Sequence, residues 1–241
     1  VSPLTVGGSV TGGTTPRCFG SSTGAMSLSG QTGSVVQWEK RVNTGGWIII
    51  ANTNTNYTEV PSSVGTWDYR ALVQSGSCAS AYSVPRSIVV VPTSVGGTTS
   101  GGTTPICRGS STGNITVSGY TGTITRWQYK LNAGGWTNIL PVSHLPNYNP
   151  TPSSAGTWQY RAQITSSPCG SAYSTARTIV VNPTTVGGSV TGGTTVCQGS
   201  NSGLVTLSGH TGSITKWQVS INAGGAWTDI ANTLTTYTSG A

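Results

Sequence analysis

Cysteine is the most regularly spaced reactive residue type in this chain of 241 residues. The five cysteines include two pairs with nearly equal separations of 60 and 62 residues, and the fifth is Cys197. The pairs are Cys18 with Cys78 and Cys107 with Cys169. Cysteines ligate metals, act as thiolate nucleophiles or form disulfides. No Cys-x-x-Cys pair or histidine cluster accompanies them, so the spacing favours structural disulfides over metal binding or thiol catalysis.

The near-equal separations predict one disulfide within each pair. In the chain-entropy description, closing a loop of about 61 residues stabilises the folded state by roughly 4 kcal/mol. All four cysteines fall at the ends of expected strands, which leaves open a bond between neighbouring repeats, from Cys78 to Cys107. Disulfides of either kind indicate an oxidising, extracytoplasmic location.

Ionisable groups suited to catalysis are scarce. The chain has four acidic residues and two histidines. The acids do not recur at matching positions, where Glu39 becomes Gln128 and Asp68 becomes Gln159. The repeats therefore lack the paired carboxylates that would serve glycoside hydrolysis or general acid–base work, and calcium between domains would need several carboxylates at each junction. The sequence therefore predicts no enzymatic activity, no cofactor and no metal site.

Basic residues outnumber acidic ones and give a formal net charge of +7. They are spread along the chain, and several recur in register, such as Arg70 and Arg161. Capture of nucleic acid requires a clustered basic stripe, so these residues are expected to have structural roles on strands. A weak attraction to acidic surface polysaccharide stays open.

An internal repeat of about 90 residues organises the chain. Trp38 recurs as Trp127 and Trp217, at spacings of 89 and 90 residues. A Thr/Gly-rich segment opens each repeat; we expect it to form the first strand and to connect the units, with its glycines permitting close packing between units. The first residues match the end of a repeat and the last repeat is incomplete, so we expect a window from a longer array. The expected organisation is the tail of a preceding repeat at 1–4, repeat 1 at 5–93, repeat 2 at 94–184, and repeat 3 at 185–241, truncated before its last two strands.

Apolar and polar residues alternate with a period of two inside each repeat, and Gly-rich turns separate these short runs. About seven strands in 90 residues predict an all-β fold of tandem immunoglobulin-like Greek-key β-sandwiches. The segment Ser-x-Gly-Thr-Trp-x-Tyr-Arg-Ala at 63–71 resembles the immunoglobulin sixth-strand motif Asp-x-Gly-x-Tyr-x-Cys. This resemblance implies that Trp67 occupies the position of the corner tyrosine and Tyr69 that of the buried cysteine. No apolar run of about 20 residues exists, so no membrane span is expected in this segment. The aromatic residues expected to fill the cores are Trp38, Trp127, Trp217, Tyr69 and Tyr160.

Two sets of residues are candidates for ligand contact. The first is the varied position in a Ser-Gly-x-Thr-Gly turn, which is Gln31, Tyr120 or His210 in the three repeats. An unconstrained turn explains this variation as well as a ligand does. The second is the recurring tryptophan set, which would form a carbohydrate-binding platform only if the side chains were exposed; its members are Trp47, Trp136 and Trp227.

The repeat resembles a known family of immunoglobulin-like modules. It has a Val-Cys-x-Gly-Ser run leading to Thr-x-Trp-Gln (196–218) and an Asn-Ala-Gly-Gly-x-Trp-Thr-x-Ile-x-x-Thr run (222–233). A Tyr-Arg-Ala run that ends in cysteine follows at the matching place in repeat 1 (69–78). These motifs are similar to the repeats of giant cell-surface proteins of Bacteroidota, which are exported by type IX secretion and include the gliding-motility adhesin. The resemblance covers essentially the whole chain. It implies a cell-surface filament without catalytic residues.

We therefore expect a structural segment of a long extracellular bacterial adhesin or filament, a disulfide-stapled stalk in adhesion or surface motility. Its expected partners are neighbouring repeats, with other copies in a fibre or a surface polysaccharide as further options, and no nucleic acid. One alternative is a carbohydrate-binding accessory array of a secreted enzyme. Another is a sheath in which units from different chains associate through unpaired strand edges.

Overall fold

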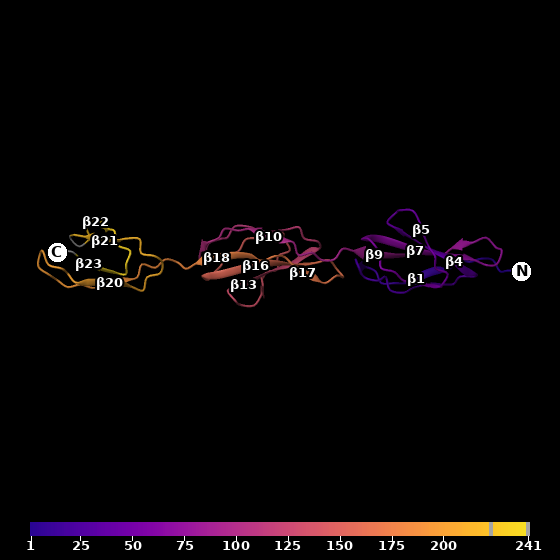
Figure 1. The fold of residues 1–241 in the computed structure, drawn as a ribbon, viewed down its shortest axis with the longest axis horizontal. Coiled ribbons are helices and arrows are strands. Elements are labelled where there is room, and N and C mark those ends of the chain that lie inside the picture. Colours follow the sequence, from indigo (N-terminus) through magenta and orange to yellow (C-terminus); the bar gives the residue numbers. More distant parts are fainter. Residues whose placement is uncertain (222–223, 240–241) are drawn as a thin grey trace.

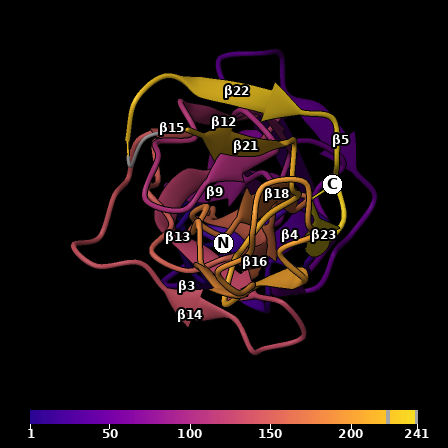
Figure 2. The ribbon, with the colours of Figure 1, turned by 90° about the vertical axis from the view of Figure 1, so that its left-hand side faces the viewer.

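The computed structural model describes residues 1–221 and 224–239. Every regular element in these residues is a β-strand, and they include no helix that could cross a membrane. The strands form three successive units, which lie in a row with the two chain ends at opposite extremes (Figure 1). Viewed along that row, the units overlap in projection (Figure 2). The predicted tandem all-β architecture is therefore confirmed.

Unit 1 is a sandwich of a three-stranded and a six-stranded sheet. The small sheet has the order β1-β3-β6, and the large sheet has the order β2-β9-β7-β4-β5, with β8 paired to β7. β2 runs parallel to β9, whereas β7 is antiparallel to both β4 and β9. The strands are β1 (Ser9–Gly12), β2 (Arg17–Cys18), β3 (Met26–Ser29), β4 (Ser34–Val42), β5 (Ile48–Ile50), β6 (Asn56–Tyr57), β7 (Gly65–Gln74), β8 (Ala81–Tyr82) and β9 (Arg86–Val91).

Unit 2 repeats this topology, with sheets β10-β12-β15 and β11-β18-β16-β13-β14, and β17 paired to β16. The long strands β13 and β16 pair through one β-bulge, at the same place as the bulge between β4 and β7. The strands are β10 (Thr98–Gly101), β11 (Ile106–Cys107), β12 (Ile115–Ser118), β13 (Thr123–Leu131), β14 (Thr137–Asn138), β15 (Asn147–Tyr148), β16 (Gly156–Thr165), β17 (Ser171–Tyr173) and β18 (Arg177–Asn182).

Unit 3 has the small sheet β19-β20-β23 and a two-stranded sheet of β21 and β22. The 241 residues hold no unit 3 counterparts of β7, β8 and β9. The faces that those strands cover in unit 1 are open here, and Trp227 is 61% exposed. The strands are β19 (Ser189–Gly192), β20 (Leu204–Ser208), β21 (Trp217–Ser220), β22 (Trp227–Ile230) and β23 (Thr236–Thr238).

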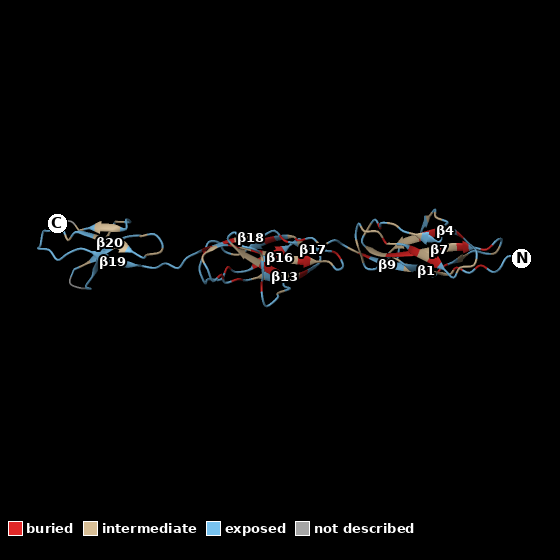
Figure 3. Cartoon of the chain, turned by 90° about the horizontal axis from the view of Figure 1, so that it is seen from below, coloured by how far each residue is buried: buried red, intermediate tan, exposed pale blue. Residues whose placement is uncertain are grey.

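The cores lie between the two sheets of units 1 and 2, where Figure 3 shows the buried residues. Alternate residues of β4 and β7 point inward because successive side chains of a strand face opposite sides. Trp38 and Tyr69 are fully buried in unit 1, and Trp127 and Tyr160 take their places in unit 2. Trp217 is only partly buried, since unit 3 has a single strand beside it in its sheet.

A tryptophan replaces the tyrosine corner of immunoglobulin sandwiches. The indole Nε1–H of Trp67 donates to the carbonyl of Ser63, four residues upstream, at 3.0 Å. Trp158 makes the same bond to Ser154 at 2.9 Å. Each bond ties the turn before the sixth strand to that strand, so the indole performs the role expected from the sequence.

The Thr/Gly-rich segments supply the first strand of each unit, as expected, but their glycines serve a different purpose. A Cβ atom on Gly7 would collide with the backbone carbonyl of Tyr82, and one on Gly96 with that of Tyr173. We expected glycine to permit close packing between units. The structure places both close approaches within a unit, against β8 and β17, because each segment folds back along its own sandwich.

Candidate functional site

A disulfide crosses the junction between units 1 and 2. It joins Cys18 to Cys169, whose Cα atoms are 5.5 Å apart. Cys18 ends β2, which pairs with the last residues of β9 at the downstream end of unit 1. Cys169 follows β16 at the upstream end of unit 2, with its Sγ 3.5 Å from the carbonyl oxygen of Pro92. The bond therefore lies beside the main-chain connection between the two units.

The expected pairing within each unit is wrong. Cys18 lies level with the start of β7, whereas Cys78 follows the end of that strand. The ten residues of β7 span about 30 Å, at about 3.3 Å per residue. A disulfide requires Cα atoms less than about 7 Å apart, so these two cysteines cannot bond across a folded unit.

The alternative bond from Cys78 to Cys107 is also wrong, although a bond between units does form. Cys78 lies at the upstream end of unit 1, where its Sγ is 3.5 Å from the carbonyl oxygen of Pro3. Cys107 lies at the downstream end of unit 2, opposite Asn182. The two are at the far ends of the pair of units. Both are free thiols in this structure, as is Cys197.

The cysteines follow one rule in units 1 and 2. Cys78 contacts Pro3 as Cys169 contacts Pro92, at the same 3.5 Å distance. Cys107 pairs with the end of β18 as Cys18 pairs with the end of β9. Each of these units thus has one cysteine facing upstream and one facing downstream. The bond of Cys18 with Cys169 joins a downstream-facing cysteine to the upstream-facing cysteine of the next unit.

Two of the three recurring tryptophans, Trp47 and Trp136, are stacked on arginines, whereas Trp227 is exposed. The guanidinium of Arg70 lies between Trp47 and Tyr82, with its central carbon 3.9 and 3.6 Å from the two ring centroids. Arg161 lies in the same way between Trp136 and Tyr173, at 4.0 and 3.8 Å. Each of these guanidiniums covers part of the indole ring on which a sugar would otherwise stack. The stacks therefore favour a structural role for these tryptophans over a carbohydrate platform.

All four carboxylates of the chain are paired with cations. The four salt bridges involve four different carboxylates, and each carboxylate accepts a hydrogen bond from a lysine or arginine. The hydrogen bonds from Lys216 and Gln218 lower the pKa of the Asp229 carboxyl. This arrangement suits structural acids. The pairs are Glu39 with Arg70, Glu59 with Lys40, Asp68 with Arg41, and Asp229 with Lys216.

Glu59 is the centre of a partly buried polar cluster that sequence reasoning missed. Its two carboxylate oxygens accept hydrogen bonds from the hydroxyls of Tyr57 and Tyr69, both at 2.7 Å, and Lys40 completes the cluster. Burial, followed by the bond to Glu59, raises the pKa of both tyrosines. One signal in the sequence could have indicated this cluster. Glu59 and Lys40 are both replaced in the next repeat, by Pro150 and Tyr129.

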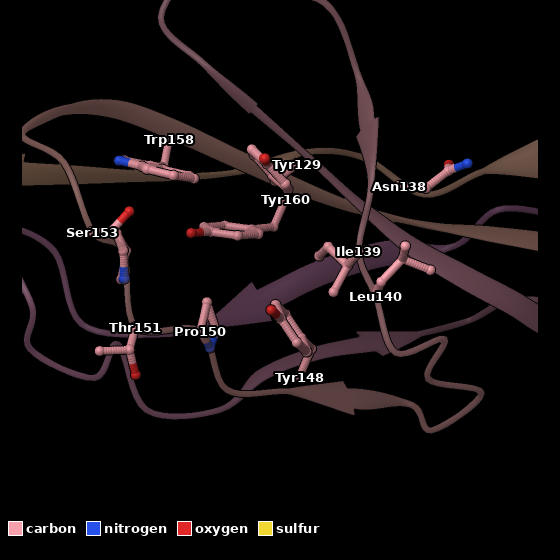
Figure 4. A pocket seen from close by; sticks show the side chains of 11 residues that line it. Tyr129, Asn138, Ile139, Leu140, Tyr148, Pro150, Thr151, Ser153, Trp158 and Tyr160 are labelled. Atoms are coloured by element: carbon pink, nitrogen blue, oxygen red, sulfur yellow. The ribbon is translucent and has the colours of Figure 1, made fainter.

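Unit 2 has a hollow at the matching place, with a volume of about 330 Å³. Pro150 stands where Glu59 stands in unit 1, and Figure 4 shows Tyr148, Tyr160, Trp158 and Ile139 around the space. The hydroxyls of Tyr148 and Tyr160 have no hydrogen-bond partner among the described residues. The hollow thus presents protonated hydroxyl donors without an acceptor.

The varied turn residues are not brought together, because each belongs to a different unit. Gln31, Tyr120 and His210 are all partly buried. Tyr120 packs against the core of unit 2. The threonine after each turn residue pairs with the opening segment of its own unit, as Thr32 does with Val6. These contacts constrain the turns and do not form a common site.

Comparison with solved structures finds tandem immunoglobulin-type domains of similar fold. Three immunoglobulin domains of titin, in an E-to-A variant, are 13% identical with a TM-score of 0.55, and the match covers 99% of this chain and 87% of that one. The FN1–FN3 domains of chicken CNTN1 are 12% identical (TM-score 0.38; coverage 99% and 88%), and a marsupial T cell receptor is 11% identical (TM-score 0.49; coverage 90% of each). At such identities the titin likeness shows the fold alone.

Sequence relatives are recognised at the family level. None of the curated proteins is similar enough in sequence to be matched. A family model described as a domain of unknown function (DUF8696) matches residues 6–92, 95–183 and 186–241. These three segments follow one another and take up most of the sequence. The chain therefore belongs to the DUF8696 family, whose domain it contains in three successive copies.

Proposed function

We propose that the chain is a load-bearing segment of a long extracellular bacterial surface protein, in which immunoglobulin-like units in series form a stalk or filament for adhesion or surface motility. The observation that carries this proposal is the disulfide between Cys18 and Cys169 across a unit junction. Such a bond persists in an oxidising compartment, which favours an extracellular location. The sequence resemblance supports Bacteroidota as the source and type IX secretion as the route.

The disulfide gives the junction a second covalent connection. A junction with the main chain alone leaves the two units free to bend and rotate, which is the default for linked domains. The bond of Cys18 to Cys169 adds a link beside the Pro92 segment, and two separate links oppose rotation about either one. A stalk that projects a binding end from a surface requires this stiffness.

The same bond redirects a pulling force. When the chain ends are pulled, force passes from residue 18 across the disulfide to residue 169, and the segment between them carries no load. Cys78 and Cys107 would each make the same bond with an adjoining unit that carries the matching cysteine. Overlapping bonds of this kind would protect most of each sandwich from mechanical unfolding.

Force spectroscopy on the full chain, pulled through its two ends, tests the proposal. A separation of 151 residues at about 3.4 Å per residue corresponds to about 500 Å of hidden contour length. We expect this length to appear only after a reductant is added, or in Cys18→Ser without reductant. Cys78→Ser is the matched control and should keep the length hidden. Equal contour lengths in oxidised and reduced wild-type protein would refute the proposal.

A further inference from the structure

The hollow in unit 2 occupies the position that the Glu59 cluster has in unit 1. In unit 1 the two tyrosine hydroxyls donate to the two oxygens of one carboxylate. In unit 2 both tyrosines are kept as Tyr148 and Tyr160, but the carboxylate is replaced by Pro150. Proline has neither a polar side chain nor a backbone N–H. The donors therefore remain while their acceptor is lost.

The donors keep their arrangement without the carboxylate. The ring centroids of Tyr148 and Tyr160 are 6.0 Å apart with an interplanar angle of 51°, against 6.0 Å and 48° for Tyr57 and Tyr69. Packing of Trp127 on Tyr148 and of Trp158 on Tyr160 holds both rings in place. Because the rings are already fixed, a ligand would bind without the entropic cost of ordering them.

The lining of the hollow is neutral and offers hydroxyl donors in place of a cation. Lys40, which neutralises Glu59 in unit 1, is replaced by the third tyrosine, Tyr129. Arg108 is exposed and does not line the hollow, but its side chain donates to the backbone carbonyl of the lining residue Ser153 at 2.7 Å. No acidic side chain lines the space. Burial raises the pKa of Tyr148 and Tyr160, so both hydroxyls keep the proton that they would donate.

We propose that this hollow binds the carboxylate of a small organic acid, held by the hydroxyls of Tyr148 and Tyr160 as unit 1 holds the carboxylate of Glu59. Hydrogen bonds from hydroxyls to a carboxylate are stronger than those between neutral groups. The volume of about 330 Å³ is at the lower end of the range for small-molecule sites, which suits a ligand of one ring or a short chain. This inference goes beyond the stalk function and does not depend on it.

Nuclear magnetic resonance of the full chain with ¹³C-labelled tyrosine tests the proposal. Sodium butyrate and sodium D-glucuronate are the two probes, which separate hydrocarbon acids from sugar acids, and butyramide and D-glucose are their neutral controls. We expect saturable shifts of the Tyr148 and Tyr160 resonances with at least one carboxylate, and at least tenfold weaker binding of its neutral control. Tyr57 is the internal reference and should not shift, since Glu59 occupies its hydroxyl.

Two variants check where the probe binds. Pro150→Glu combined with Tyr129→Lys copies the unit 1 cluster and should abolish the shifts. Tyr148→Phe combined with Tyr160→Phe keeps the rings, removes only the hydroxyls and should weaken binding at least tenfold. This second variant tests the proposal even if the first variant does not fold. The proposal is overturned if neither carboxylate gives a saturable shift, if the neutral controls bind equally well, or if the double phenylalanine variant binds as the wild type does.

Discussion

Replacement of Cys18 by serine should destabilise units 1 and 2 together. The bond from Cys18 to Cys169 closes a loop with a sequence separation of 151 residues. In the chain-entropy description, a loop of this length restricts the unfolded chain by about 5 kcal/mol at 25 °C. For a cooperative segment of this size, 1 kcal/mol shifts the melting temperature by about 2–4 °C. We therefore expect Cys18→Ser to lower the melting temperature of units 1 and 2 by about 10–20 °C.

Differential scanning calorimetry of the oxidised full chain measures this shift. Cys78→Ser is the matched control, because it removes a thiol in unit 1 that has no bond in this structure. We expect the control to melt within about 2 °C of the wild type, since substitutions away from structural features change stability by about 0.5 kcal/mol or less. Dithiothreitol should bring the wild type down to the level of Cys18→Ser. Equal shifts in the two variants would contradict the assigned pairing.

Three further predictions concern the interior of the units. Glu59→Ala should destabilise unit 1 by about 2–4 kcal/mol in urea unfolding, because it leaves a lysine and two tyrosine hydroxyls without their acceptor, whereas Pro150→Ala should cost much less. Trp67→Phe should cost about 1–3 kcal/mol in the same assay, and a loss below 0.5 kcal/mol would show that the indole hydrogen bond is dispensable. Burial raises the pKa of Tyr69, so the folded state holds the hydroxyl proton more tightly than the unfolded chain does. The free energy of unfolding should therefore be constant with respect to this group below about pH 10 and fall at higher pH, where only the unfolded chain loses the proton. Tyr69→Phe should reduce this fall in unfolding free energy between about pH 9 and 11.

Much of the fold could be predicted because it depends on local patterns that the repeat shows more than once. The alternation around Trp38 and Trp127 marks strands with one face inward, and both indoles are fully buried. The turn before Trp67 has the order of an immunoglobulin corner, and the indole makes the corner bond. These features involve residues close in sequence, or residues whose period of two already identifies the buried face.

The polar cluster of unit 1 could not be assembled in this way. Glu59 lies 19 residues from Lys40 and ten from Tyr69, on segments whose separation in space depends on how the two sheets pack. Comparison of the repeats shows that Glu59 and Lys40 are both replaced in unit 2. It does not show that the two side chains touch, nor that a hollow remains beside Pro150.

The sequence by itself determined the repeat, the all-β architecture and the core aromatic residues of units 1 and 2, because periodicity and turn composition act over a few residues. Only the tertiary structure decided how the cysteines pair. The nearly equal spacing of Cys18 to Cys78 and of Cys107 to Cys169 follows from the repeat alone. It would be found whether the disulfides form within units or between them. The ten-residue length of β7 places the two cysteines of a unit at opposite ends, so the nearest partner of each belongs to the neighbouring unit.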